Sequence, residues 1–379
     1  MTGFSTAEYR SRIAKITKYI QNSGKDGFLV INPYNVFYLG LYFYPGKRPL
    51  GVYISKNGTV TAFTPRMEQH EAEKISHFDR VIAYDDDYSG KSDFFSLLKK
   101  NILPAGDILA DEVGLSAYNR LQSIFASLEI SDHIYTLRAV KSPEEVEMLR
   151  LSGVYSDYMV ECGKEMLKPG VTELGLLNRM ITKTVDKMIA EMGDVIYVPG
   201  GPAGALVPSG LRTALPHALP SGKTVEAGDP MILSTGSNVW GYRTESERTF
   251  FVGEPTKEML DAFSVMYEAQ KLAITLMKPG TRCCDVEKQT CDFIINAGYG
   301  KYIRHRTGHG KGLEEHEPPF IADGDETVIE SGMIFSSEPG IYIEGVAGVR
   351  HSDIVLVTEQ GGVTLTNYPK DIESMIVAF

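Results

Sequence analysis

The sequence predicts a two-domain α/β protein, and three observations support this. Its 379 residues exceed the usual size of one domain, about 150 residues. Strand-like and helix-like segments alternate along the first third, as in sheets covered by helices. The rest of the chain contains two similar series of elements, each with a long helix that ends in Lys-Pro-Gly. We expect a small domain over residues 1–137 and a larger one over 138–379.

The small domain is expected to form a sheet with helices packed on it. Apolar segments over 28–31 and 50–54 are typical of buried strands, and the turn Asn57-Gly58 follows the second. A further strand is expected over 108–113, and the apolar-periodic segment 121–128 predicts the next helix. This strand-then-helix order favours a doubly wound sheet.

A long helix is expected to begin after Ser142. Ser142 is a suitable N-cap, Pro143 occupies the first helical position, and Glu145 lies three residues after the cap, which is a capping-box pattern. Apolar residues then recur every three or four positions as far as Lys168-Pro169-Gly170. The boundary between the domains is placed just before this helix.

The large domain is interpreted as an internal duplication. A second long helix, over 256–277, also ends in Lys-Pro-Gly, and the two endings lie 110 residues apart. Further helices are expected over 172–191 and 284–297, each followed by strand-rich sequence. Two halves related by a pseudo-twofold axis would leave a central cleft lined by strands from both, a suitable place for an active site.

Composition and charge exclude several classes of protein. A net charge of −11 would repel nucleic acid or an anionic membrane. No run of about 20 apolar residues predicts a membrane-spanning helix, and the N-terminal sequence lacks the apolar centre of a signal peptide. The four cysteines suit reduced structural thiols, since they form no CxxC pair. We expect a cytoplasmic protein with no nucleic-acid and no membrane partner.

Histidines gather beside acidic residues in the last two fifths of the chain. In the string His305-Arg306-Thr307-Gly308-His309-Gly310, followed by His316, the glycines would allow a ligand to approach the backbone closely. A single histidine of this kind often only hydrogen-bonds its loop, but the whole string favours a site. His217 and Arg350 lie in similar polar motifs.

Three glutamates are candidates for the same cleft. A strand over 244–252 would place Glu245 and Glu247 on one face, because side chains alternate along a strand. Close carboxylates repel unless a cation, a shared proton or a positive substrate group relieves them, and the alternative is a solvated sheet face. Glu338 is expected at the end of a strand, where the chain turns and the side chain can project into the cleft.

Together these motifs resemble the creatinase, prolidase and aminopeptidase P family along essentially the whole chain. In family order they are PHALPSG, the stretch 228–242, ERTFFVGEP, HRTGHGKGL with HEPP, SEPGIY and GVRHSD. The resemblance implies a creatinase-type N-terminal α/β domain and a pita-bread catalytic domain with a pseudo-twofold repeat. It also implies a homodimer.

The resemblance further implies a changed metal site. Metallopeptidases of this family bind two metal ions through Asp, Asp, His, Glu and Glu, and the matching positions are Ser234, Glu245, His309, Glu338 and Ser352. Serine hydroxyls supply neither the charge nor the bridging lone pairs of a two-metal centre. We expect no cofactor, with one Mn, Zn or Co ion on His309, Glu338 and Glu245 as the open alternative.

The pattern is most similar to the metal-free creatinase branch, which implies roles for the remaining residues. His217 would be the general acid/base, and Glu247 and Glu338 would hold a cationic or polarised nitrogen group, with His316 as a further catalytic candidate. The substrate-binding candidates are Arg48, which would clamp the substrate carboxylate, and His309, Arg350 and Glu245. A solvated loop arginine is the alternative for Arg48.

The sequence therefore predicts a hydrolase that cleaves a carbon–nitrogen bond in a small carboxylate-bearing molecule, without a dinuclear metal centre. Creatine itself is not expected, because Ser352 and Phe320 replace residues that creatinase uses. One alternative is a metal-dependent Xaa-Pro dipeptidase or aminopeptidase with altered ligands. The other is a non-catalytic peptide-binding domain, although such a domain has no chemical reason to keep the histidines of the site.

Overall fold

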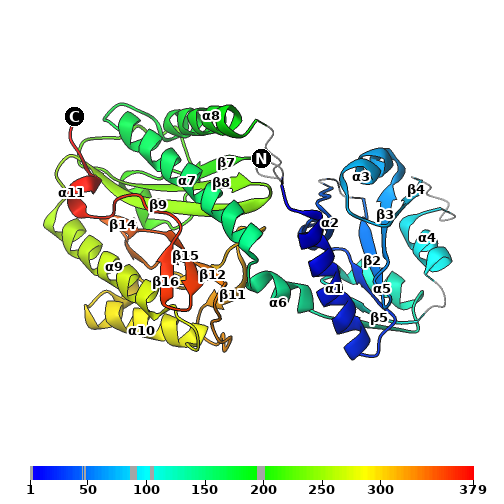
Figure 1. The fold of residues 1–379 in the computed structure, drawn as a ribbon. Helices are drawn as coiled ribbons and strands as arrows, with labels where there is room; N and C mark the ends of the chain where they lie inside the picture. The colour runs from blue at the N-terminus through cyan, green and yellow to red at the C-terminus, as the bar shows by residue number, and fades with distance from the viewer. Residues whose placement is uncertain (1–2, 45, 47, 86–91, 103–105, 194–200) are drawn as a thin grey trace. The chain divides into compact units, whose positions relative to one another are not determined.

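The computed structural model describes residues 3–44, 46, 48–85, 92–102, 106–193 and 201–379. The chain divides into two compact units, residues 2–137 and 138–379, and each is described separately (Figure 1). Within the described residues, no helix is both long enough and apolar enough to cross a membrane.

The first unit is built on one six-stranded sheet in the order β4-β3-β2-β1-β5-β6. Its strands are β1 (Gly27–Val30), β2 (Gly51–Ser55), β3 (Val60–Pro65), β4 (Arg80–Tyr84), β5 (Asp107–Ala110) and β6 (Ser127–Ile130). The strands expected near 28–31, 50–54 and 108–113 are confirmed. The sheet is mixed rather than fully parallel, because β2 pairs antiparallel with both β1 and β3. Gly58 forms part of the connection between β2 and β3 with φ of +86°, a conformation that favours glycine.

Helices accompany this sheet: α1 (Thr6–Asn22), α2 (Pro33–Gly40), α3 (Gln69–Ile75), α4 (Phe94–Asn101), α5 (Leu115–Gln122) and α6 (His133–Ala139), with a 3₁₀ turn η1 (Arg66–Glu68). The helix expected over 121–128 is wrong. The helix α5 ends at Gln122, and residues 127–130 pair with β5 as the parallel strand β6. Leu121, Ile124 and Phe125 are buried in the core of this unit, so the apolar spacing comes from a buried turn before a strand.

The second unit contains the long helices that the sequence predicts. They are α7 (Pro143–Met166), α8 (Glu173–Met192), α9 (Lys257–Leu276) and α10 (Cys283–Asn296), with the short helices η2 (Gly210–Ala214), η3 (Gly300–Tyr302) and α11 (Ile372–Met375). The capping box of α7 is confirmed: the Ser142 hydroxyl accepts from the Glu145 N–H at 3.2 Å, and the Glu145 carboxylate accepts from the Ser142 N–H at 2.9 Å. Side-chain capping thus sets the start of the helix.

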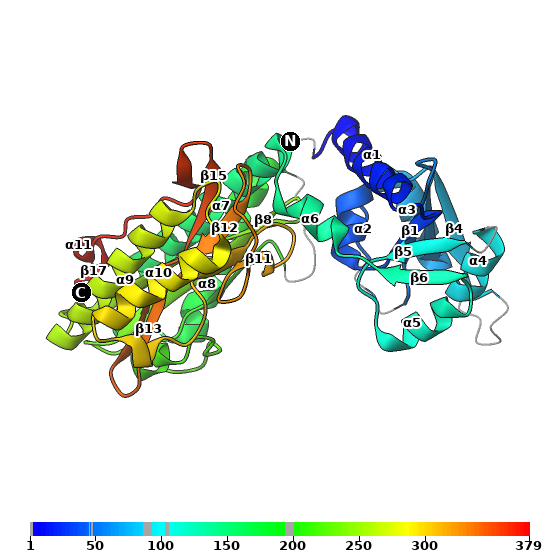
Figure 2. The same ribbon diagram turned by 90° about the horizontal axis from the view of Figure 1, so that it is seen from below.

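Two main sheets and a ribbon complete the second unit. The first sheet has the order β17-β9-β8-β7, the second β11-β10-β12-β15-β16, and β13 pairs with β14. Figures 1 and 2 show α7 and α8 along the first sheet and α9 and α10 along the second. The strands are β7 (Ala203–Leu206), β8 (Pro230–Val239), β9 (Tyr242–Val252), β10 (Gly308–Gly310), β11 (Glu317–Ile321), β12 (Ile334–Ser337), β13 (Gly340–Ile343), β14 (Ala347–Arg350), β15 (Asp353–Thr358), β16 (Gly361–Thr364) and β17 (Ile376–Val377).

The expected internal repeat is visible in equivalent backbone hydrogen bonds. After α7, the N–H of Gly170 bonds the carbonyl of Val225 at 2.9 Å, and after α9 the N–H of Gly280 bonds that of Ile329 at 2.9 Å. Both glycines have φ near +90°, which ends the Lys-Pro-Gly turn in the left-handed region. The next hydrogen bonds along each turn also match. The N–H of Glu173 bonds the carbonyl of Lys223 at 3.0 Å, and the N–H of Cys283 bonds the carbonyl of Thr327 at 3.0 Å. The two halves therefore share one local design.

Candidate active site

A cavity of about 350 Å³ lies in the second unit. Its lining comes from the loop after η2, from β7, β8, β9 and β14, and from the segments after β10 and β12. The lining includes His217, Ser234, Arg243, Glu245, Glu247, Glu315, His316, Glu338 and Arg350. Most of the candidate residues that are far apart in the sequence thus face one space.

The β8–β9 hairpin positions the two glutamates of the cavity. In its antiparallel register Gly236 lies opposite Glu245, and Ser234 lies opposite Glu247. Alternation along β9 turns both glutamates into the cavity, as expected, while Ser246 turns away and donates to Asp157 at 2.7 Å. The alternative of a solvated sheet face is wrong, because the exposed fractions of the Glu245 and Glu247 side chains are only 14% and 6%.

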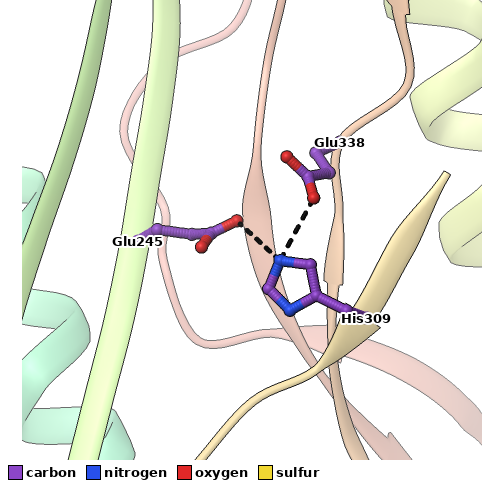
Figure 3. Close-up of side chains that lie close together, drawn as sticks. All are labelled: Glu245, His309 and Glu338. Carbon is purple, nitrogen blue, oxygen red and sulfur yellow. Dashed lines mark ion pairs between the residues drawn. The ribbon is translucent and has the colours of Figure 1, made fainter. Parts of the chain in front are cut away.

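His309 on β10 lies between two carboxylates (Figure 3). Its Nε2 atom is 3.1 Å from Oε1 of Glu338 and 3.9 Å from Oε1 of Glu245. Its Nδ1 atom is 2.9 Å from the carbonyl of Gly310, which assigns the ring proton to Nδ1. Nε2 is buried and makes no hydrogen bond within the described residues. A bare imidazole lone pair this close to two carboxylates is repulsive, so Nε2 needs either a proton of its own or a cation between it and the carboxylates.

The charges around His309 act on one another. Burial lowers the pKa of His309, but Glu338 and Glu245 outweigh burial, and the net direction is upward. Burial raises the pKa of Glu338, but His309 and Arg350 reverse this and hold it well below its usual range. Glu338 is therefore an ionised carboxylate in the folded protein. Its position directly after β12, at the turn into β13, agrees with the sequence expectation.

Glu247 is held by a cation and a hydroxyl. The Arg350 guanidinium donates to both oxygens of Glu247, and the Ser234 hydroxyl donates to Oε1. Arg350 also donates to the Tyr342 hydroxyl at 2.9 Å, and that hydroxyl lies 2.7 Å from Nε2 of His305. Arg350 and Glu247 thus form a buried, bidentate pair in the cavity wall.

Lys311 contacts the other side of Glu245. Its ammonium donates to Oε2 of Glu245 at 2.6 Å and to the Glu315 backbone carbonyl at 2.9 Å, and only 1% of its side chain is exposed. Burial lowers the pKa of Lys311, but Glu245 and Glu315 outweigh burial and raise it above its ordinary value. Glu245 is therefore an ion-pair partner through one oxygen and faces His309 with the other.

The candidate histidines His217 and His316 also line the cavity, and both are exposed. The His316 ring lies 4.2 Å from that of His309, centroid to centroid. Partial burial, His309 and Lys311 lower the pKa of His316 to about 4, so the ring is neutral at neutral pH. His217 lies in the turn that follows η2.

Arg48 lies in the first unit, where it lines a separate cavity of about 240 Å³ with Tyr44 and Leu50. The predicted contact between Arg48 and a substrate carboxylate stays a prediction.

Sequence reasoning missed Lys311 and Tyr342. Both lie inside motifs that the sequence made conspicuous: Lys311 follows Gly310 in HRTGHGKGL, and Tyr342 ends SEPGIY. A lysine inside a histidine- and glycine-rich string was the available signal. No sequence signal existed for the Tyr342 hydroxyl, because its partners His305 and Arg350 come from other segments.

Comparison with known proteins gives a consistent family. The model of the metallopeptidase family M24 matches residues 147–359, and that of the creatinase/prolidase N-terminal domain matches 12–140. The Xaa-Pro dipeptidase of Lactobacillus delbrueckii subsp. lactis is 31% identical over 370 residues, 96% of this chain and 98% of the relative. The solved Xaa-Pro dipeptidase from Bacillus anthracis has a TM-score of 0.84 at 27% identity, with 97% and 99% of the chains covered. The solved structure of a dipeptidase from Mycobacterium ulcerans has a TM-score of 0.88 at 28% identity, with 100% of each chain covered.

These similarities confirm the predicted fold and enzyme class and correct one expectation. Because the matching family consists of metallopeptidases and three ligand atoms converge at His309, the expectation that no cofactor is needed is not supported. The relatives favour the peptidase alternative over the metal-free reading. The chain belongs to the metallopeptidase family M24, with a pita-bread catalytic domain, and is a hydrolase of the creatinase and Xaa-Pro peptidase type.

Proposed function

We propose that this protein is a metal-dependent hydrolase that cleaves the carbon–nitrogen bond of Xaa-Pro-type dipeptides, with one divalent ion on Glu245, His309 and Glu338. One observation carries the proposal: a ligand atom from each of these residues lies within 4.8 Å of the others, and the unbonded Nε2 of His309 faces both carboxylates. The relatives named Xaa-Pro dipeptidase support the substrate class.

The donor set fits a single Mn²⁺, Zn²⁺ or Co²⁺ ion. One imidazole nitrogen and two carboxylates match the three protein ligands of many catalytic sites. The Gly310 carbonyl fixes the tautomer of His309, as the outer contacts of metal-binding histidines generally do. When bound, such an ion supplies a Lewis acid and lowers the pKa of its water. Ser234 and Ser352 stand where a second ion would need carboxylates, which favours one ion over two.

The side chains around the triad suit amide hydrolysis. His217 is exposed at the cavity lining and would transfer a proton from the attacking water to the leaving nitrogen. The neutral His316 would hydrogen-bond the substrate carbonyl oxygen as charge develops on it. The Glu247–Arg350 pair keeps its geometry, since both of its charges are already paired, and serves as a rigid polar wall.

Metal content combined with peptide hydrolysis tests this proposal. Protein stripped with a chelator and then loaded with Mn²⁺, Zn²⁺ or Co²⁺ should retain close to one ion per chain after desalting and should regain hydrolysis of Xaa-Pro dipeptides. His309→Ala should retain no ion and show no activity while keeping its fold by circular dichroism. Undiminished peptide hydrolysis by the stripped protein would contradict the proposal.

A metal-free hydrolase of the creatinase type is the second candidate. The observation in its favour is that Lys311 already pairs with Glu245, while Ser234 and Ser352 replace two carboxylates. In that case a protonated His309 would hold Glu245 and Glu338 together. Zero metal uptake, with activity on small amides or guanidino acids, would favour this candidate.

A further inference from the structure

The ammonium group of Lys311 is enclosed inside the cavity wall and uses all of its donors. It contacts Oε2 of Glu245 at 2.6 Å, the Glu315 carbonyl at 2.9 Å and Oε2 of Glu315 at 3.3 Å. These three acceptors match the three N–H donors of an ammonium group. With 1% of its side chain exposed, Lys311 is shielded from solvent. Its action on the site therefore passes through Glu245.

The two oxygens of Glu245 are divided between two partners. Oε2 accepts from Lys311, while Oε1 accepts from the Ser352 hydroxyl at 2.8 Å and faces Nε2 of His309. A carboxylate that bridges two metal ions needs one oxygen for each ion. In this protein a fixed ammonium already occupies the second oxygen.

The sum of the formal charges also favours one divalent ion over two. The carboxylates Glu245, Glu247 and Glu338 face the cations Lys311 and Arg350, which leaves a net charge of −1. The Arg243–Glu315 pair adds nothing, because its two charges cancel. One divalent ion would bring the site to about +1, and a second would bring it to about +3 in a poorly solvated space.

We infer that Lys311 takes the place of a second metal ion and limits the site to one. Lys311 is thus a positioning residue: it neutralises Glu245 and presents a single oxygen of that carboxylate to the ion. This inference rests on the proposed single-ion function.

Metal titration of Lys311 variants tests the inference on the full chain. By calorimetry with Mn²⁺, Lys311→Met should bind the ion at least about tenfold more tightly, because a repelling charge next to a ligand is removed. Lys311→Arg keeps the charge and should stay within about threefold of the unmodified protein. Lys141→Met is the matched control: Lys141 is equally buried and pairs with Glu317 at 3.0 Å, outside the cavity lining.

A double variant that retains Lys311 keeps the test decisive if Lys311→Met does not fold. Ser234→Asp with Ser352→Glu restores carboxylates and should still bind one ion per chain while Lys311 is present. Where Lys311→Met folds, adding it to the double variant should raise the stoichiometry to two. Two ions in the double variant, or unchanged Mn²⁺ affinity in Lys311→Met, would overturn the inference alone. A complete lack of Mn²⁺ binding by the unmodified protein would instead overturn the proposed function.

Discussion

At the residue scale, existing contacts decide which carboxylates in the cavity remain available to a ligand. Arg350 and Ser234 occupy both oxygens of Glu247. Lys311 occupies one oxygen of Glu245, and the other accepts from the neutral hydroxyl of Ser352. Glu338 faces Nε2 of His309 at 3.1 Å. The chemistry therefore depends less on how many acids the cavity contains than on which of their oxygens are unpaired.

His217→Ala should lower kcat on an Xaa-Pro dipeptide by about a hundredfold or more, because positioned proton donors contribute about 10²–10⁴. Its melting temperature should hardly change, since the side chain is exposed. His70→Ala, at an exposed histidine in the first unit, is the control. Steady-state kinetics and thermal melting provide the two readouts, and an unchanged kcat would remove His217 from the mechanism.

His351 makes stability depend on pH. The ring is fully buried, accepts from the Thr249 N–H at 3.3 Å and lies 3.3 Å from the Lys370 carbonyl, and burial lowers its pKa to about 3. The unfolded chain binds a proton near pH 6.5, whereas the folded chain does not until about pH 3. The contribution of the neutral His351 ring to the free energy of unfolding is therefore fully present above pH 6.5. It is lost as the pH falls toward 3, at up to about 1.4 kcal/mol per pH unit.

Urea unfolding between pH 7.5 and pH 4.5 checks this prediction. The free energy of unfolding should fall with pH, and His351→Gln, which keeps a donor for the Lys370 carbonyl, should show a shallower slope by about one proton. Equal slopes in the two proteins would show that other groups cause the pH dependence.

At the element scale, the loop that carries His217 is anchored to the start of α8. The buried carboxylate of Glu173 accepts from Ser209 through its N–H at 2.8 Å and its hydroxyl at 3.0 Å. It accepts from Ser221 in the same way, at 2.9 Å and 2.7 Å, and from Arg212 at 3.2 Å. Because both ends of the loop bond to one side chain, this contact sets the position of the turn with His217.

Glu173→Gln should therefore impair catalysis without abolishing folding. The amide replaces an acceptor with a donor that faces N–H and hydroxyl groups, so we expect a loss of stability of about 1–3 kcal/mol. We expect kcat/KM to fall by about tenfold or more, since the His217 loop is no longer held. Glu258→Gln, in the exposed first turn of α9, should change neither quantity. An unaltered kcat/KM in Glu173→Gln would show that this anchor has no role in positioning His217.

At the scale of the whole molecule, duplication explains why the site lies where it does. The β8–β9 hairpin of one half contributes Glu245 and Glu247, and the sheet of the other half contributes His309 and Glu338. This cavity thus collects opposing side chains from two copies of one local design. A change to either half is expected to affect the same site.

The homodimer that the family resemblance implies is a prediction at this scale. Leu211, Leu215 and Leu219 are exposed close to His217 in sequence, and grouped exposed leucines are typical of surfaces that another protein covers. Sedimentation equilibrium should give twice the chain mass of 41.9 kDa. A mass of one chain at micromolar concentration, unchanged on further concentration, would contradict the dimer.

Local sequence signals predicted much of this protein, because their physics acts over a few residues. The Ser142 cap, the alternation of Glu245 and Glu247, and the repeated Lys-Pro-Gly turns each depend on neighbours within one turn or strand. The order of the motifs was enough to indicate the family and the cavity-lining residues. The helix expected over 121–128 failed because local apolar spacing does not distinguish a buried turn and strand from a helix.

The pairing of charges could not be read in this way. Lys311 and Glu245 are 66 residues apart, and Arg350 and Glu247 are 103 apart. Each carboxylate had several basic residues in the chain that could have paired with it, and the packing of β9, β10 and β14 brought one of them within reach. A buried charge must be paired wherever the fold places it, so the identity of its partner is a property of tertiary packing.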